Sequence, residues 1–129
     1  RLSVVANSVS RGLAVIYQDM FDLSVAEWRV IAVLGPDKAM SAKDITDITI
    51  MDKVAVSRAV QRLIEAERLS AYPDAQDRRR QVLKLTQAGL DVFEAVVPLA
   101  LAYQARLSER LSDAELHEFT RLLDKIGAK

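Results

Sequence analysis

Apolar residues recur along most of this 129-residue chain at spacings of three and four, a pattern typical of amphipathic helices. The first such stripe predicts a helix from about residue 2 to residue 20. Its members are Leu2, Val5, Val9, Leu13, Ile16 and Met20. Long helices that carry such a stripe at the end of a chain often pack against a partner. This helix is therefore a candidate for contacts with a second molecule.

Two capping boxes predict where the next helices begin. Ser24-Val-Ala-Glu27 opens a second helix that runs through Leu34 and is closed by Gly35-Pro36. Ser41-Ala-Lys-Asp44 is a weaker box, with Asp in place of Glu, and it opens a short third helix through about Ile48.

A fourth helix and a hairpin are predicted next. Asp52 is a suitable N-cap for a helix that runs to about Leu69. The period of the pattern then changes to that of strands. Strand candidates at residues 70–72 and 81–85 are separated by Pro73 and a charged loop, as a hairpin requires.

The C-terminal third of the chain predicts two more helices. Thr86 caps a long fifth helix, which Pro98 should bend or break. One face of that helix carries Leu90, Phe93, Val97, Leu101, Gln104 and Leu111. A further capping box, Ser112-Asp-Ala-Glu115, opens the last helix. The apolar side of the last helix is formed by Leu116, Phe119, Leu122, Leu123 and Ile126. The predicted fold is therefore mostly α, with one small β-hairpin.

The fourth helix separates an apolar side from a basic side. Its predicted buried side consists of Val56, Val60, Leu63 and Ile64. Arg58 and Arg62 lie nearly opposite, and Lys53 and Ser57 lie at the margin near the N-terminus. Arginine can bind guanine O6 and N7 as a bidentate pair or clamp a phosphate. A solvated helix face has the same composition, so both interpretations stay open for this helix alone.

Composition changes the picture mainly by exclusion. Half of the residues are hydrophobic, enough for one core, or for one core and a dimer interface. We find no run of about 18 uncharged apolar residues and no signal-peptide pattern, so we expect a soluble, cytoplasmic protein without a membrane partner. The chain contains no cysteine and no arrangement typical of a catalytic site, so an enzyme is not expected. Because it begins at Arg1 rather than Met, we expect upstream residues to be missing.

The net charge is zero, but the charge is unevenly distributed. Between Asp52 and Thr86, eight basic and five acidic residues give +3, which leaves −3 on the rest of the chain. Positive charge gathered in one segment can attract phosphates even on a neutral protein. The segment includes the hairpin tip Asp77-Arg78-Arg79-Arg80, which suits a minor groove or its flanking phosphates. A solvated turn is the alternative interpretation of this tip.

Four segments, taken in order, carry a likeness to a known family. They are Ser-Val-Ala-Glu-Trp-Arg-Val at residues 24–30, a helix-turn-helix from Ser41 to Leu69, the tip Asp77-Arg78-Arg79, and Val82-Leu-Lys-Leu-Thr86 before Gly89. This order resembles the MarR family of winged helix-turn-helix regulators over nearly the whole chain. The resemblance implies a homodimer held by the first, fifth and sixth helices, a recognition helix in the major groove, and a wing in the adjoining minor groove. It implies one domain, 1–129, in which about 24–86 bind DNA and about 2–20 and 87–127 dimerise.

The resemblance also implies which residues meet double-stranded DNA. The predicted contacts on the third and fourth helices are Ser41, Lys43, Lys53, Ala55, Ser57, Arg58 and Arg62. Those on the wing are Arg78, Arg79 and Arg80, with Arg79 as the principal contact and Asp77 holding it in place. Two positions depart from the family pattern. Arg68 stands where Gly is frequent, which requires a positive φ or a different helix end, and Ala55 stands where Thr is frequent.

The family further implies control by a ligand, an oxidant or a metal. The absence of cysteine removes thiol oxidation, and the single histidine, His117, does not by itself predict a metal site, so we expect no metal and no cofactor. Small organic anions such as aromatic carboxylates remain as possible effectors. The pocket candidates, for each of which ordinary packing is the more common role, are Tyr17, Trp28, Arg29 and Tyr103.

The sequence thus predicts a homodimeric, ligand-responsive repressor that binds a pseudo-palindromic DNA operator. The alternative is a winged-helix module that binds an acidic protein partner, because arginine pairs with carboxylates as well as with phosphates. Competition with duplex DNA separates the two.

Overall fold

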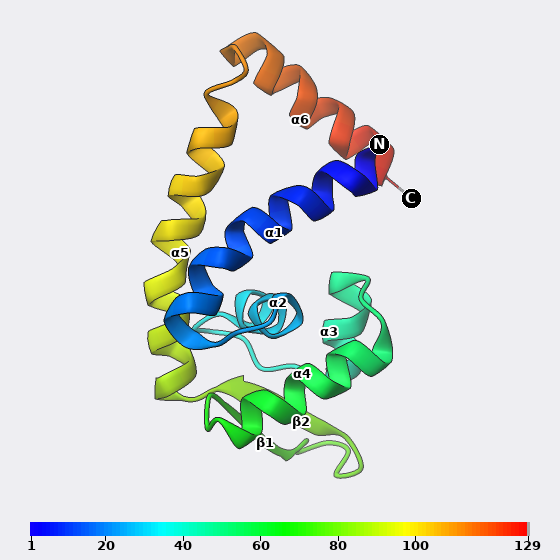
Figure 1. The fold of residues 1–129 in the computed structure, drawn as a ribbon. Helices are drawn as coiled ribbons and strands as arrows, with labels where there is room; N and C mark the ends of the chain where they lie inside the picture. Colours follow the sequence, from blue (N-terminus) through cyan, green and yellow to red (C-terminus); the bar gives the residue numbers. More distant parts are fainter. Residues whose placement is uncertain (129) are drawn as a thin grey trace. The chain divides into compact units, whose positions relative to one another are not determined.

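Residues 1 to 128, the part of the chain that the computed structural model describes, form six helices and one two-stranded antiparallel sheet (Figure 1). The elements are α1 (Leu2–Phe21), α2 (Val25–Leu34), α3 (Ala42–Thr49), α4 (Lys53–Glu65), β1 (Leu69–Pro73), β2 (Gln81–Leu85), α5 (Gln87–Ser108) and α6 (Asp113–Gly127). The mostly helical fold class predicted from the sequence is confirmed. The chain divides into two compact units, one ending at Val96 and the other beginning at Val97, and each is described by itself. The assignment of 1–129 to one domain stays a prediction.

The predicted N-caps begin the helices where the sequence places them. The side chains of Ser24, Ser41, Asp52 and Ser112 each accept a hydrogen bond from the backbone N–H three residues later. At Ser41 and Ser112 the full capping box forms. At Ser24 the side chain of Glu27 does not close the predicted box but instead accepts a hydrogen bond from the Ser24 hydroxyl, at 3.1 Å.

The prediction that the fourth helix runs to about Leu69 is wrong. α4 ends at Glu65, and Leu69 is the first residue of β1. Of the two alternatives given for Arg68, the second applies: Arg68 has no positive φ and the helix ends differently, with the positive φ of 59° at Glu67. The turn is closed by the Arg68 N–H, which donates to the carbonyl of Leu63 at 2.9 Å. No glycine or proline marks this helix end, and residues 65–68 are good helix formers. The helix ends here because Leu69 pairs with Leu85 in the hairpin.

The wing is a hairpin whose root is attached to the helical lobe. β1 pairs with β2 in a register that runs from Leu69↔Leu85 to Pro73↔Gln81. Pro73, which the sequence placed in the loop, therefore ends β1. Leu83 also pairs with Met40, because its N–H donates to the Met40 carbonyl at 2.8 Å and its carbonyl accepts in return at 3.1 Å.

The core of the first unit is built around α2, of which Val30, Ile31 and Leu34 are almost completely buried. Buried apolar side chains also come from the other elements and from the α1–α2 turn: Ala14, Tyr17, Leu23, Ile45, Val56, Ala59, Leu63, Leu69, Leu83, Val92 and Val96. In α4 the buried side is centred on Val56, Ala59 and Leu63. Val60 and Ile64, which the sequence placed among the buried residues, are only half-buried and line a pocket with Leu83.

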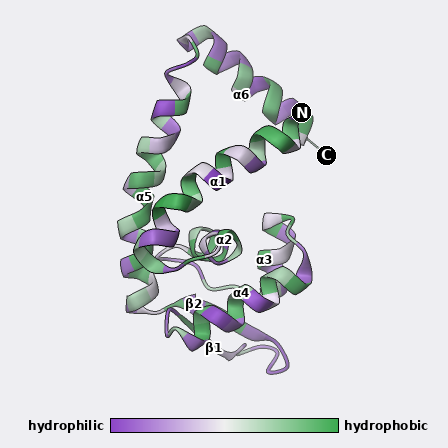
Figure 2. Cartoon of the chain, viewed as in Figure 1, coloured by the Kyte–Doolittle hydropathy of each residue, from purple (hydrophilic) through white to green (hydrophobic). Residues whose placement is uncertain are grey.

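Helices α1, α5 and α6 carry apolar residues along much of their length (Figure 2). In the single chain the apolar residues of α6 are almost all exposed, those of α1 are exposed in part, and those of α5 are mostly buried or half-buried. Of the stripe predicted on α1, Leu2, Val5 and Met20 are more than half exposed. No residue of α6 is buried, and Phe119 is 48% exposed. Exposed apolar surfaces of this kind are typical of sites that another protein surface covers.

α5 runs through Pro98 as one helix, so of the two predicted effects of that residue the break does not occur, and the bend stays a prediction. The helix ends at Ser108, and Leu111, which the sequence placed on its face, lies beyond it. Within the described part of the chain, α5 alone is long and apolar enough to cross a membrane by length and composition. It nevertheless carries Asp91, Glu94 and Arg106. Length and composition of this kind also suit a helix that packs against protein.

Gly89 is the residue around which α4, β1 and α5 join. A Cβ at this position would lie 2.0 Å from the carbonyl oxygen of Arg68. That carbonyl accepts the backbone N–H of Thr86 at 3.1 Å, and the Thr86 hydroxyl accepts the backbone N–H of Gly89 at 3.1 Å. Any side chain at residue 89 must therefore separate backbone segments that hold one another.

We expect Gly89→Ala to lower the free energy of unfolding by about 2 kcal/mol or more, because the clash is with backbone and cannot be relieved by a side-chain rotation. Urea denaturation followed by circular dichroism measures the change. Gly127→Ala is the matched control, since nothing lies within 4 Å of a Cβ there. Equal stability of the two variants would contradict the role given to Gly89.

Candidate nucleic-acid interface

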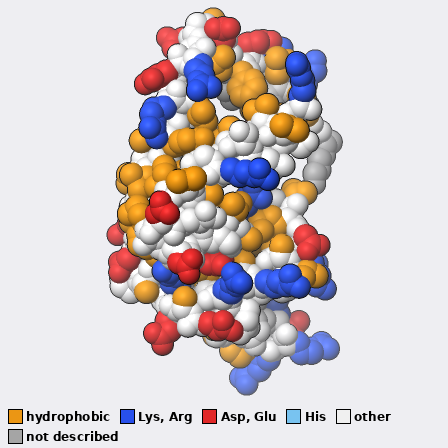
Figure 3. Space-filling model, in the orientation of Figure 1, with side chains coloured by type: hydrophobic (Ala, Val, Ile, Leu, Met, Phe, Trp, Pro, Cys, Tyr) orange, Lys and Arg blue, Asp and Glu red, His pale blue; other side chains and the backbone are white. Residues whose placement is uncertain are grey.

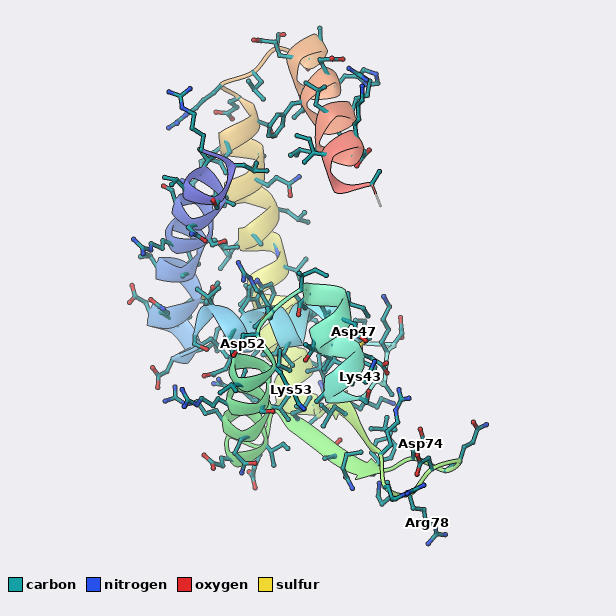
Figure 4. All side chains as sticks on the ribbon, turned by 90° about the vertical axis from the view of Figure 1, so that its right-hand side faces the viewer. Lys43, Asp47, Asp52, Lys53, Asp74 and Arg78 are labelled. Carbon is teal, nitrogen blue, oxygen red and sulfur yellow. The ribbon has the colours of Figure 1, made fainter. Side chains whose placement is uncertain are left out.

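The start of α3 and the start of α4 form two walls of one groove. The groove is lined by Ala42, Lys43, Thr46 and Asp47 from α3 and by Lys53 and Ser57 from α4. Lys43 Nζ lies 2.9 Å from Asp47 Oδ2, and this hydrogen bond raises the pKa of Lys43. Figure 4 shows Lys43 and Asp47 on α3, with Asp52 and Lys53 at the start of α4. Two N-terminal helix ends with exposed lysines thus share this side of the lobe, a charge arrangement suited to anions.

Ser41, predicted to contact DNA, is buried, and its polar groups are engaged within α3. Its hydroxyl accepts the backbone N–H of Asp44 at 3.1 Å, and its own N–H donates to Asp44 Oδ2 at 3.2 Å. That second hydrogen bond is the largest cause of the lowered pKa of Asp44. Ser41 therefore shapes the beginning of α3 rather than offering a free hydroxyl.

The outer side of α4 is exposed where the sequence predicted contacts. Lys53, Ser57 and Arg58 are exposed, and Ala55 is half-buried. Arg58 makes no ion pair with any residue from 1 to 128, so its guanidinium is available. Val54 is 55% exposed beside them and was not among the predicted contacts. Its position on the helix was the only signal that could have indicated it.

Arg62, one turn after Arg58, is tied to α2. Arg62 Nη1 lies 3.7 Å from Glu27 Oε1, and the Glu27 side chain is only 7% exposed. The buried carboxylate also accepts the hydrogen bond from the Ser24 hydroxyl. Arg62 therefore has a structural partner that Arg58 lacks. Local sequence patterns could not show this pair, because its members belong to different helices.

The three arginines of the wing tip lie in different surroundings. Arg79 is almost fully exposed, its Nε lies 3.6 Å from Asp77 Oδ1, and its backbone N–H donates to the same oxygen at 3.1 Å. Arg80 bonds to Asp44 on α3 and lies 3.8 Å from Asp74. Arg78 extends from the outer end of the wing, away from α3 and α4 (Figure 4). The structure thus brings Asp77 and Arg79 together as the sequence predicted, and it adds a pair between the wing and α3.

Basic and acidic side chains alternate on this surface. Figure 3 shows Lys and Arg side chains over α4 and at the end of the wing, with Asp and Glu side chains among them. Mixed charge of this kind limits non-specific attraction while leaving individual cations exposed.

Of the four pocket candidates, Tyr17 and Trp28 belong to the core of the first unit. Their ring centroids are 5.8 Å apart, and Trp28 lies 6.5 Å from Phe93. Burial raises the pKa of Tyr17, and the charge of Arg29 opposes that shift. Arg29 itself is exposed and donates to Ser10 Oγ at 3.3 Å.

The fourth candidate, Tyr103, lies in the second unit, where the Arg106 guanidinium carbon is 5.8 Å from its ring centroid. Residues 1 to 128 contain no group of three or more histidine, aspartate or glutamate side chains placed to hold a metal ion. Neither unit thus offers, among its described residues, a ready-made metal centre.

The chain is similar to known transcriptional regulators. A family model described as the MarR family matches residues 21–80. The crystal structure of a MarR/EmrR family transcriptional regulator from Acinetobacter sp. ADP1 has 30% identity and a TM-score of 0.86, with 97% of this chain and 88% of that one covered. BpsR of Bordetella bronchiseptica, described with the regulation of its DNA binding by 6-hydroxynicotinic acid, has 25% identity and a TM-score of 0.78, with 97% of both chains covered.

A curated relative is also similar. The HTH-type transcriptional repressor IacR of Pseudomonas putida is 24% identical over 105 residues, which are 81% of this chain. The chain spans 63% of the length of that relative. The extent of the likeness to the Acinetobacter regulator, together with the matching helix order and wing, shows that the chain belongs to the MarR family of winged helix-turn-helix transcriptional regulators.

Proposed function

We propose that this protein is a cytoplasmic transcriptional repressor that binds a specific duplex DNA operator as a homodimer. The observation that carries the proposal is that two basic surfaces, the outer side of α4 and the wing tip, are attached to one lobe. The Met40–Leu83 pairing fixes the wing root against the chain that leads into α3. Membership of a regulator family and the repressor activity named for IacR support the same function.

In this proposal α4 enters the major groove and the wing reaches the adjoining minor groove. Lys53, Ala55, Ser57 and Arg58 form the contact surface of α4, and Lys43 meets a backbone phosphate from α3. Arg78 and Arg79 supply the exposed charge of the wing. Ser41 acts through the helix start that it caps. Arg62 is already paired with a buried carboxylate and therefore makes the smaller direct contribution.

We expect Arg79→Ala and Arg58→Ala to weaken DNA binding in different ways. Arg79→Ala should lower affinity for all duplexes and reduce the salt slope by about 0.9 for each phosphate that the protein no longer neutralises. Arg58→Ala should cost about 1–3 kcal/mol on the preferred duplex and relax selection at one base pair. Fluorescence anisotropy with a duplex selected by the protein from a random pool, and with a scrambled duplex, measures both.

The specific-regulator proposal fails if the unaltered protein binds selected and scrambled duplexes equally. Displacement of DNA by an acidic peptide, without preference among duplexes, would instead favour the protein-binding alternative.

The dimer is proposed from the apolar side chains that α1 and α6 leave exposed. Leu2, Val4 and Val5 on α1 are each more than half exposed, and so is Ile126 on α6. Exposed apolar side chains that gather at one end of a helix, rather than occurring singly, are typical of an interface. We propose that α1, α5 and α6 pair with those of a second copy, which would place two α4 helices on half-sites roughly 10 bp apart.

We expect Phe119→Glu to weaken dimerisation by about tenfold or more, because a buried phenylalanine contributes about 1.5–3 kcal/mol and each dimer contains two copies. Sedimentation velocity over a concentration series measures the shift toward monomer. Ile48→Glu on α3 is the control, since Ile48 is 60% exposed and lies outside the proposed interface. A monomeric unaltered protein at high concentration would contradict the dimer.

We propose that the effector is a small aromatic carboxylate. The ligand named for BpsR is of this class. In this chain the exposed Arg29 directly follows Trp28 in α2, and the ring of Trp28 lies 5.8 Å from that of Tyr17, so a cation is attached next to a pair of aromatic rings. Arginine holds carboxylates through paired hydrogen bonds.

We expect 6-hydroxynicotinic acid, as a probe of this class, to reduce affinity for the selected duplex about tenfold. Arg29→Gln should abolish most of that response, whereas Arg11→Gln, which alters an exposed arginine of α1, should keep it. The same anisotropy measurement, repeated with and without the acid, gives the result. A response that is equal in both variants removes Arg29 from the site.

A further inference from the structure

Arg80 differs from the two arginines before it, because its charge is already held by two carboxylates. One nitrogen of its guanidinium bonds to Asp44 Oδ2, and Nε lies 3.8 Å from Asp74 Oδ2. Its side chain is 46% exposed, against 96% for Arg79. A guanidinium in this position is only partly available to a phosphate.

The Asp44 end of the pair lies at the N-terminus of α3. Its Oδ2 accepts the backbone N–H of Ser41 at 3.2 Å as well as the Arg80 guanidinium. One carboxylate oxygen thus joins the first turn of the helix-turn-helix to the wing. The Ser41 N–H, and to a smaller extent the Arg80 charge, lower the pKa of Asp44, because both favour its ionised form.

The backbone of Arg80 closes the wing loop. The N–H of Asp74 donates to the Arg80 carbonyl at 2.8 Å, and the Arg80 N–H donates to the Asp77 carbonyl at 2.9 Å. Arg78 and Arg79 lie inside the loop that these two hydrogen bonds close. A side chain that anchors residue 80 to α3 therefore restrains the whole tip.

We propose that Arg80 is a positioning residue, which fixes the wing loop against α3 through Asp44 and Asp74 and thereby presents Arg78 and Arg79 to DNA without contacting DNA itself. The inference rests on the proposed function. It also changes the role predicted for Arg80 from the sequence, which grouped the three arginines as contacts.

The competing role, a phosphate contact by Arg80, has the opposite electrostatic consequence. Arg80 would have either to leave its two carboxylates or to bring their negative charges close to the phosphates. Removal of either carboxylate would then free the arginine and strengthen binding. If Arg80 is a positioning residue, loss of the Asp44 carboxylate leaves the wing tip disordered. Ordering the tip on binding then costs free energy, which weakens binding to DNA.

Asp44→Asn and Asp47→Asn form a matched pair that separates the two roles. In Asp44→Asn the new side-chain amide retains an oxygen for the Ser41 N–H, so the helix cap persists while the negative charge is removed. Asp47 lies on the same helix and pairs with Lys43, not with the wing. We expect Asp44→Asn to reduce affinity for the selected duplex about three- to tenfold, and Asp47→Asn to increase it because a negative charge near phosphates is removed.

A second pair of variants tests whether Arg80 acts through the tip. Arg80→Gln should lower affinity in the unaltered protein but add little in a background that carries both Arg78→Gln and Arg79→Gln, because the order of the tip matters only when the tip binds DNA. Additive losses, or tighter binding by Asp44→Asn to match Asp47→Asn, would assign Arg80 to a phosphate and overturn the inference.

A readout without DNA keeps this test separate from that of the proposed function. Trypsin should cleave after Arg78 and Arg79 in the free protein faster in Asp44→Asn and in Arg80→Gln than in Asp47→Asn. Unchanged cleavage rates would overturn the restraint on the loop. If the unaltered protein binds no duplex preferentially, the proposed function fails while the cleavage rates still decide whether Arg80 holds the wing.

Discussion

The placement of the wing depends on Leu83, the residue at which three parts of the chain are joined. Its backbone pairs with Ala71 across the hairpin and with Met40 on its other edge, and its side chain is 2% exposed in the core. A two-stranded hairpin alone is marginally stable in water, so the third segment and the buried side chain are what make the wing a fixed part of the lobe. Because Met40 immediately precedes the cap of α3, the same contact sets the distance between the wing and the helix-turn-helix.

Given that fixed distance, the pairing of charges decides which cations remain available. Three arginines of the basic segment are each held by carboxylates: Arg62 by Glu27, Arg79 by Asp77, and Arg80 by Asp44 and Asp74. The degree of exposure then ranks them, because a pair that is nearly all in solvent is weak and easily exchanged for a phosphate. The Arg79–Asp77 pair is of this weak, solvent-exposed kind, whereas Arg62 is paired with the buried carboxylate of Glu27. The net charge of +3 on this segment therefore says less about DNA contacts than does the identity of the few arginines whose ion pairs are weak or absent.

The parts of the fold that could be predicted from the sequence are those with a local cause. Ser24, Ser41, Asp52 and Ser112 cap helices by reaching only three residues ahead, and β2 was placed at 81–85 by its alternation. The end of α4 was missed because residues 65–68 favour helix and the stop is imposed by pairing of Leu69 with Leu85. The link between Arg80 and Asp44 spans 36 residues, so no local period could indicate it. The helical period predicted which candidate residues are exposed, but it could not predict their ion-pair partners, which lie on other elements.

The apolar stripe of α6 shows why prediction of an element and prediction of its environment are different problems. The capping box and the spacing of Phe119, Leu122 and Ile126 define the helix, yet no residue of α6 is buried in the single chain. A helix of 15 residues is marginal in water unless tertiary packing stabilises it. In the proposed dimer the partner would supply that packing, so the ordering of α6 and the association of two chains would be one linked equilibrium. The distance between the two α4 helices of the proposed dimer would then depend on the same apolar contacts that stabilise α6. An effector that altered those contacts would change that distance and so the affinity for the operator.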